Sequence, residues 1–325
     1  MANSTFSVSE NFRALDPWDF HSKYFRENVH SDGRKLTDFR PTSLQHGTLT
    51  SAHGSAMIKV GNTSVMASVK GELCEPAMDF PNRGHVSLSL DWSLGSASTS
   101  EKQQNQLSQC LAILNQFLSQ GTILPLESLC LKPGQWAWVL YCELLILDYD
   151  GGLLDTCFAA LVAAMTNTKL PNVSFPGEST ENESDSALLG SEHIKLEKLR
   201  PEILQNAKML PLRLCHRPIS ASFSGFFTEE NELRLVADPS AEEEAGIFPL
   251  LLTVAVLEKG KTEDLAGVWT FSSSACSALS KQTNALCDAP MTEGNFRKIL
   301  SLARKRHSEM THLIDEAEKL CVTVM

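Results

Sequence analysis

The sequence lacks several features that would place the chain in a familiar class. No apolar run reaches the ~18 residues that cross a bilayer, and the richest run, 136–147, carries Glu143. The opening stretch MANSTFSVSENF has no basic region followed by an apolar core, so we expect no secretory signal. The nine cysteines include no CxxC and no Cys/His pair at zinc spacing. These absences favour reduced, mostly buried thiols in an intracellular compartment.

Positive charge is also scarce. The chain has 28 Lys and Arg against 39 Asp and Glu, which gives a formal net charge of −11. A protein that binds nucleic acid alone usually presents a basic surface, because contacts to phosphates supply most of the nonspecific affinity. We therefore do not expect a free-standing RNA-binding module. Any contact with RNA must be local, or partner chains must supply the positive charge.

Apolar periodicity predicts an ordered first half. Alternating residues predict a β-hairpin over 54–71, and residues 75–100, which have a Ser-rich end, are expected to be irregular. A capping-box pattern and regularly spaced leucines predict a helix over 101–121. The run 136–147 is apolar on both faces, as in a central strand, and a very apolar helix is expected over 153–165. Its four alanines permit close approach to a sheet.

The second half repeats this order after an acidic, Ser-rich segment. A hairpin is predicted over 218–238, two strands near 248–257 and 265–272, and a long helix over 292–320. The repetition favours an α+β fold with two similar βα halves packed as one unit. The division that we predict is a disordered tail (1–14), a first half (15–175), an acidic linker (176–199) and a second half with the C-terminal helix (200–325).

The stretch DYDGGLLDTCFAALVAAM (148–165) raises the question of chemistry. Asp148, Asp150 and Asp155 are either a carboxylate set for acid/base work or Mg²⁺, or turn and N-cap residues before a buried helix. We favour the turn, with Asp150 and the glycines forming it. The acidic run 242–244 is either a divalent-cation site or a solvated loop, and we favour the loop.

Other chemistry-bearing side chains fit ordinary roles better. Trp136 and Trp138 are apolar-strand residues, so core or subunit interface is favoured over base stacking. The basic stretch 303–307 is interpreted as the exposed face of an amphipathic helix. Four histidines lie in no metal or catalytic-triad spacing and are expected at the surface or in the core: His46, His53, His85 and His216.

Four segments occur in a distinctive order. They are SDGRKLTDFRP (31–41), GSAMIKVGNTSVMASVKGELCEP (54–76), DYDGGLLDTCFAALVAAM (148–165) and LVADPSAEEEA (235–245). Together they resemble the RNase PH family, which comprises RNase PH itself and the ring subunits of the RNA exosome. The resemblance covers about residues 15–320 and implies the RNase PH-like fold, also described as ribosomal protein S5 domain 2-like.

The resemblance also implies a test for activity. Active members degrade RNA from its 3′ end with inorganic phosphate, and a Thr or Ser and then an Arg follow their glycine pair. Here Leu153 and Leu154 follow Gly151 and Gly152. Leucine offers phosphate no donor and would desolvate it. The segment AGIFPLLLTV (245–254) also lacks the acid of active members. We therefore expect a degenerate phosphate site at these four residues, with no catalytic residue, cofactor or metal.

What remains is a role in an assembly. Arg83 and Lys102 are all that is left of the family's basic cluster and are the predicted RNA contacts. The implied partners are other RNase PH-like ring subunits, cap subunits, an associated catalytic nuclease and single-stranded RNA in the assembled channel, with no membrane. The implied location is the nucleus, including the nucleolus, and the cytoplasm. The alternatives are an active phosphorolytic 3′-exoribonuclease and a contributor of RNA-binding residues to a neighbour's composite site.

Overall fold

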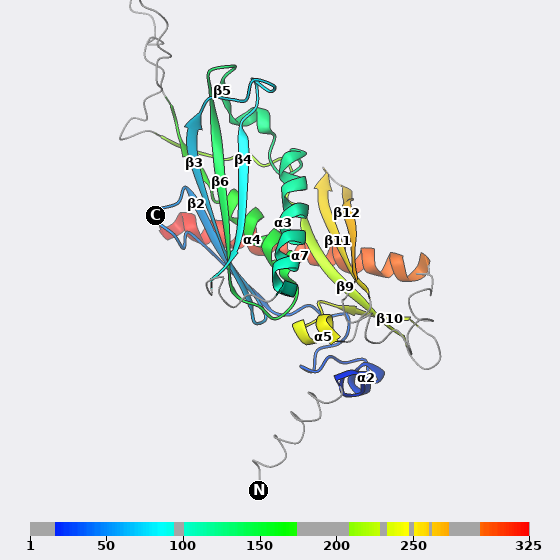
Figure 1. Ribbon diagram of the computed structural model, residues 1–325. Coiled ribbons are helices and arrows are strands. Elements are labelled where there is room, and N and C mark those ends of the chain that lie inside the picture. Colours follow the sequence, from blue (N-terminus) through cyan, green and yellow to red (C-terminus); the bar gives the residue numbers. More distant parts are fainter. Residues whose placement is uncertain are drawn as a thin grey trace, which may run out of the picture.

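The computed structural model describes residues 17–93, 101–173, 208–227, 233–246, 250–259, 262–272 and 293–324. Two sheets with helices between them form the framework (Figure 1). The predicted borders of the tail and of the acidic linker lie outside the described residues and remain predictions. No helix in the described part of the chain is long and apolar enough to cross a membrane.

The first sheet contains the predicted hairpin at its centre. Its strands run in the order β1 (Thr42–His46), β2 (Gly54–Val60), β3 (Thr63–Cys74), β6 (Trp136–Asp148) and β4 (His85–Trp92), while β5 (Cys130–Lys132) pairs with β6. The prediction for 54–71 is confirmed, because β2 and β3 pair antiparallel with Val60 opposite Thr63. Ile58 and Val65 face each other in this pair and are fully buried.

The expectation that 75–100 is irregular is wrong in part. Residues 85–92 form β4, which pairs in parallel with β6. Leu88 and Leu90 are buried in the hydrophobic core of the first half (the first core), and Ser89 between them is exposed. The alternation is therefore present in HVSLSLDW. Its two central polar positions, Ser87 and Ser89, are serines, which gave the segment a loop-like composition.

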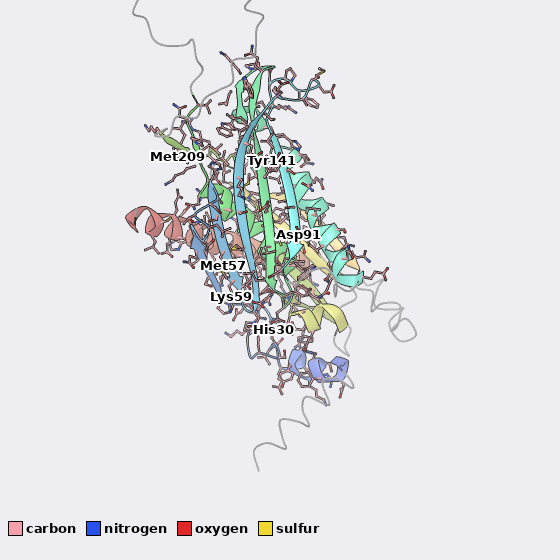
Figure 2. All side chains as sticks on the ribbon, turned by 60° about the vertical axis from the view of Figure 1, so that its left-hand side comes forward. His30, Met57, Lys59, Asp91, Tyr141 and Met209 are labelled. Carbon is pink, nitrogen blue, oxygen red and sulfur yellow. The ribbon has the colours of Figure 1, made fainter. Side chains whose placement is uncertain are left out.

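Helices cover one face of this sheet. The predicted helices are confirmed as α3 (Glu101–Ser119) and α4 (Leu153–Thr166). The alanines of α4 are buried and pack against β2 and β3, and a Cβ added to Gly54 would lie 2.7 Å from the Ala164 carbonyl oxygen. This close approach requires glycine at position 54. Figure 2 shows Met57, Lys59, Tyr141 and Asp91 on the opposite face, which no described helix covers.

The second sheet is antiparallel throughout its described strands. The order is β10 (Leu233–Ala237), β9 (Ile219–Phe227), β11 (Leu250–Lys259) and β12 (Thr262–Ser272), which confirms the predicted hairpin and strands. The shorter elements are α2 (Pro17–Arg26), the 3₁₀ helix η2 (Leu126–Leu129), β7 (Lys169–Pro171), which pairs with β8 (Met209–Pro211), and α5 (Ala241–Gly246).

One long helix ties the two halves together. The predicted C-terminal helix is α7 (Glu293–Val324), and its 32 residues span about 48 Å. Ile299 and Ala303 belong to the second core, whereas Met310 and Ile314 belong to the first. The helix α4 also contacts both sheets, through β2 and β3 on one side and β9 on the other. The halves therefore pack as one unit.

Candidate phosphate site at the junction of the two halves

The glycine pair forms the turn from β6 into α4. Gly151 and Gly152 have φ values of +81° and +64°, in the left-handed region that favours glycine. Gly152 is the N-cap of α4 and receives no side-chain capping bond, so within the predicted turn and N-cap a glycine rather than Asp150 takes the N-cap position. A Cβ on Gly151 would lie 2.5 Å from the Pro239 carbonyl oxygen. The fold itself therefore requires glycine here, independently of any phosphate.

A glutamate from the second half lies at the N-terminus of α4. The Gly152 N–H donates to Glu244 Oε1 at 2.8 Å, and Tyr149 Oη donates to Glu244 Oε2 at 2.8 Å. Gln106 Nε2 of α3 in turn donates to Tyr149 Oη at 3.4 Å. Backbone N–H groups at a helix N-terminus favour anions such as phosphate. In this chain the Gly152 N–H at that position is already bonded to the Glu244 side chain of the same protein.

The environment of Glu244 favours its protonated form. Burial is the main cause, and it raises the pKa of this carboxyl from 4.5 to about 7, despite the hydrogen bonds from Gly152 and Tyr149. In either protonation state one oxygen remains free to accept the Gly152 N–H. The contact therefore does not depend on the charge of Glu244.

The two leucines that follow the glycine pair point into the core. Leu153 and Leu154 are each 5% exposed and belong to the core cluster of the first half. An apolar side chain provides neither a hydrogen bond nor a charge to an oxyanion. The structure thus brings Gly151, Gly152 and both leucines together at one junction and adds Glu244 to them.

The three aspartates of the junction accept hydrogen bonds from different groups and do not converge on one site. Asp148 Oδ2 accepts from Ser64 Oγ at 2.9 Å, and Asp150 Oδ2 accepts from Asn62 Nδ2 at 3.1 Å. Asp155 crosses to β9, where it accepts from Ser220 Oγ at 2.7 Å and from the Ser222 N–H at 2.6 Å. Burial raises the pKa of Asp155 to about 6. Within the described residues, no group of three His, Cys, Asp or Glu side chains could hold a metal ion.

A buried ion pair holds the Asp-Pro loop against the junction. Arg40 Nε and Nη2 donate to Asp238 Oδ2 and Oδ1 at 2.9 and 2.6 Å, and the Arg40 backbone N–H donates to Oδ2 at 2.8 Å. The same guanidinium contacts the carbonyl oxygens of Asp150 and Gly151. Burial opposes the charge of Asp238, but the hydrogen bonds and charge of Arg40 outweigh it and lower the pKa of the carboxyl. Arg40 lies in the segment 31–41 and Asp238 in the segment 235–245, both of which carry the family resemblance, but no local pattern pairs them.

The acidic run is not a solvated loop, so that interpretation is wrong. The three glutamates lie on the short helix α5, and only Glu242, with a 49% exposed side chain, faces solvent. Glu243 is buried against His30, whose Nδ1 lies 3.2 Å from the carboxylate (His30 is labelled in Figure 2). Successive residues of a helix point about 100° apart. Glu242, Glu243 and Glu244 therefore reach solvent, the histidine and the junction respectively.

The predicted RNA contacts lie far apart. Arg83 precedes β4, its Nε donates to Glu127 Oε1 at 2.9 Å, and its guanidinium lies 5.3 Å from the Phe80 ring centroid. Lys102 lies in the first turn of α3, beyond the other end of β4, and its side chain is outside the described residues. The eight residues of β4 span roughly 26 Å. The two residues therefore do not form one patch.

A mixed α+β fold whose glycine junction meets an Asp-Pro loop defines an RNase PH-like protein. Residues 38–171 match domain 1 of the 3′ exoribonuclease family, RNase PH. The chain is 30% identical over 235 residues to the exosome complex component rrp43 of Schizosaccharomyces pombe, an alignment that covers 72% of this chain and 78% of that protein. The chain therefore belongs to the RNase PH family.

Further relatives agree with this assignment. The exosome complex component Rrp42 of Methanothermobacter thermautotrophicus is 26% identical over 291 residues, which is 88% of this chain and 89% of that protein. Among solved structures, a chain of an archaeal exosome core has a TM-score of 0.59 at 20% identity, covering 90% of this chain and 95% of its own. Rice (Oryza sativa) Rrp46 has a TM-score of 0.55 at 16% identity, covering 88% and 98%. These likenesses confirm the predicted fold class.

Proposed function

We propose that this chain is a non-catalytic ring subunit of an RNA exosome. It would hold neighbouring RNase PH-like subunits and form part of the wall of the channel that single-stranded RNA enters. Support comes from relatives that are named exosome components and align over most of both chains. The observation that carries the non-catalytic part is the hydrogen bond from the Gly152 N–H to Glu244.

The chemistry of phosphorolysis explains why this bond matters. The attacking phosphate needs N–H donors and a cation to hold its charge next to the RNA end. Here the Gly152 N–H is bonded to Glu244, and the Arg40 guanidinium is bonded to Asp238. Leu154 supplies no donor. A phosphate ion at this junction would displace protein hydrogen bonds and face buried carboxylates.

The wider assembly belongs to the same proposal. The family resemblance implies cap subunits and a separate catalytic nuclease as partners, and residence in the nucleus, the nucleolus and the cytoplasm. Arg83 is retained as a candidate RNA contact because its side chain is 47% exposed beside Glu127. We expect the chain alone to be poorly soluble or to self-associate, and co-expression with a ring neighbour to restore a defined particle. Native mass measurement of the purified particle tests this part.

Activity is tested directly with RNA and inorganic phosphate. We expect the purified chain to release no nucleoside diphosphate from an RNA 3′ end, and the variant Glu244→Gln to behave in the same way. Phosphate-dependent release by the unaltered chain would overturn the non-catalytic assignment. A monodisperse monomer that forms no complex with ring neighbours would overturn the structural assignment, so the two parts can fail separately.

A further inference from the structure

A groove lies beside the edge strand of the second sheet, away from the glycine junction. It is enclosed by the segment 27–37 after α2, by β10 and by the N-terminal part of α7, which lie together at one end of the molecule (Figure 1). Its volume is about 820 Å³, and it is open to solvent. None of the residues of the glycine junction lines this groove.

The groove is cationic in an acidic protein. Its charged lining residues are three cations, Lys35, Arg234 and Lys298, and one carboxylate, Glu27. In the described part of the chain, none of the three cations forms an ion pair with a carboxylate. Arg234 Nη1 instead donates to Asn28 Oδ1 at 2.9 Å and to the carbonyl oxygen of Arg26 at 3.2 Å, which fixes its charge in the groove wall. A local excess of positive charge on a chain of net charge −11 favours an acidic ligand.

The strand that borders the groove, β10, is an edge strand, and within the described residues its outer side is paired only in part. The Asp238 N–H donates to the Ser222 carbonyl oxygen in β9 at 3.0 Å, whereas the Ala237 N–H points away from β9 and donates to the Leu36 carbonyl oxygen at 2.7 Å. Because these directions alternate along a strand, the N–H and C=O of Leu235 also point away from β9. Leu235 lines the groove, and no backbone group among the described residues pairs with its outer edge. Such an edge is a template for a further strand.

We propose that this groove binds an extended acidic peptide of a partner protein, which adds as a strand to β10. The peptide backbone would pair with the outward N–H and C=O of Leu235, and its carboxylates would face Lys35, Arg234 and Lys298. Strand addition of this kind takes affinity from main-chain bonds and specificity from alternate side chains. RNA does not present such a main-chain array. Among the described residues, the lining also contains no aromatic side chain on which a base would stack.

The test uses the full-length chain and a fluorescent peptide that alternates glutamate with valine. A second peptide has the same sequence but carries N-methyl groups on alternate amides, which removes strand pairing and keeps the charge. The groove variant is Lys35→Glu combined with Lys298→Glu, both at exposed side chains. The matched control is Lys59→Glu, an exposed lysine on the first sheet. Labelled oligouridylate serves as the RNA probe.

We expect saturable binding of the acidic peptide, weakened at least about tenfold by the double charge reversal and unchanged by the Lys59 control. N-methylation should weaken binding by a similar factor. Three results would each overturn the proposal: no saturable binding of the peptide, equal binding of the N-methylated peptide, or tighter binding of oligouridylate that displaces the peptide and depends on the same two lysines.

Discussion

Replacing Glu244 with glutamine should stabilise the chain at neutral and alkaline pH. Its carboxyl has a pKa of about 7 in the folded chain, against 4.5 for an ordinary glutamate. Between these values the folded chain retains a proton that the unfolded chain has released. The free energy of unfolding therefore falls as the pH rises through this window and levels off above it. At about 1.4 kcal/mol per pH unit, the effect is roughly 3 kcal/mol.

Glutamine should remove this effect because it stays neutral. Its side-chain oxygen can accept the Gly152 N–H as Glu244 does, and its amide can donate to Tyr149 Oη. We expect E244Q to exceed the unaltered chain by about 2–3 kcal/mol near pH 8 and to match it within about 1 kcal/mol near pH 5. Burial also raises the pKa of Asp155 to about 6, which adds a second contribution that falls between about pH 4 and 6 in both proteins.

Urea unfolding of dilute protein, followed by tryptophan fluorescence at several pH values, measures these differences. Asp238 and Glu243 have lowered pKa values, so the stability that they contribute is lost only when the pH falls below the ordinary carboxyl pKa. They therefore do not change the free energy of unfolding between about pH 5 and 8. Glu242→Gln is the matched control on the same helix, since its side chain is half exposed. Equal pH dependence of E244Q and the unaltered chain would refute the assigned environment of Glu244.

Three further substitutions probe the same account. Arg40→Ala should destabilise the chain by about 3–5 kcal/mol, because it leaves Asp238 buried without its charge partner; a shift of the urea midpoint worth less than about 1 kcal/mol would argue against the ion pair. Gly151→Ala should cost more stability than Gly134→Ala, since both glycines have positive φ but only the first meets a neighbouring loop; equal thermal midpoints would contradict the contact. Arg83→Glu in the assembled ring should weaken RNA binding several-fold, and unchanged affinity in a filter-binding assay would remove this residue from the channel wall.

Local patterns were enough to predict most elements, because alternation and helical spacing reflect burial of neighbouring residues. The hairpin over 54–71 and the helix α4 are examples. The contacts of the junction were not predictable in this way, because they join distant parts of the chain. Glu244 lies 92 residues from Gly152, Arg40 lies 198 from Asp238, and Glu243 lies 213 from His30. No local pattern shows that two glutamates of an acidic run turn inward.

The sequence did indicate what is absent from the junction. Leucines after a glycine pair supply no side-chain donor at their two positions whatever the fold, because this follows from side-chain chemistry alone. The sequence did not indicate that Glu244 would accept the Gly152 N–H, because this contact depends on how the second half packs against α4. The expectation of a degenerate phosphate site rests on residue types and stays a prediction, whereas the contact between Glu244 and Gly152 depends on the tertiary structure.

The most direct test is a phosphate soak of crystals of the assembled ring. The account predicts that the Gly152 N–H remains bonded to Glu244, with no anion beside it at phosphate concentrations that fill active relatives. A phosphate ion within hydrogen-bond distance of the Gly152 N–H, with the Glu244 side chain displaced, would contradict the central claim that this subunit cannot hold the attacking nucleophile.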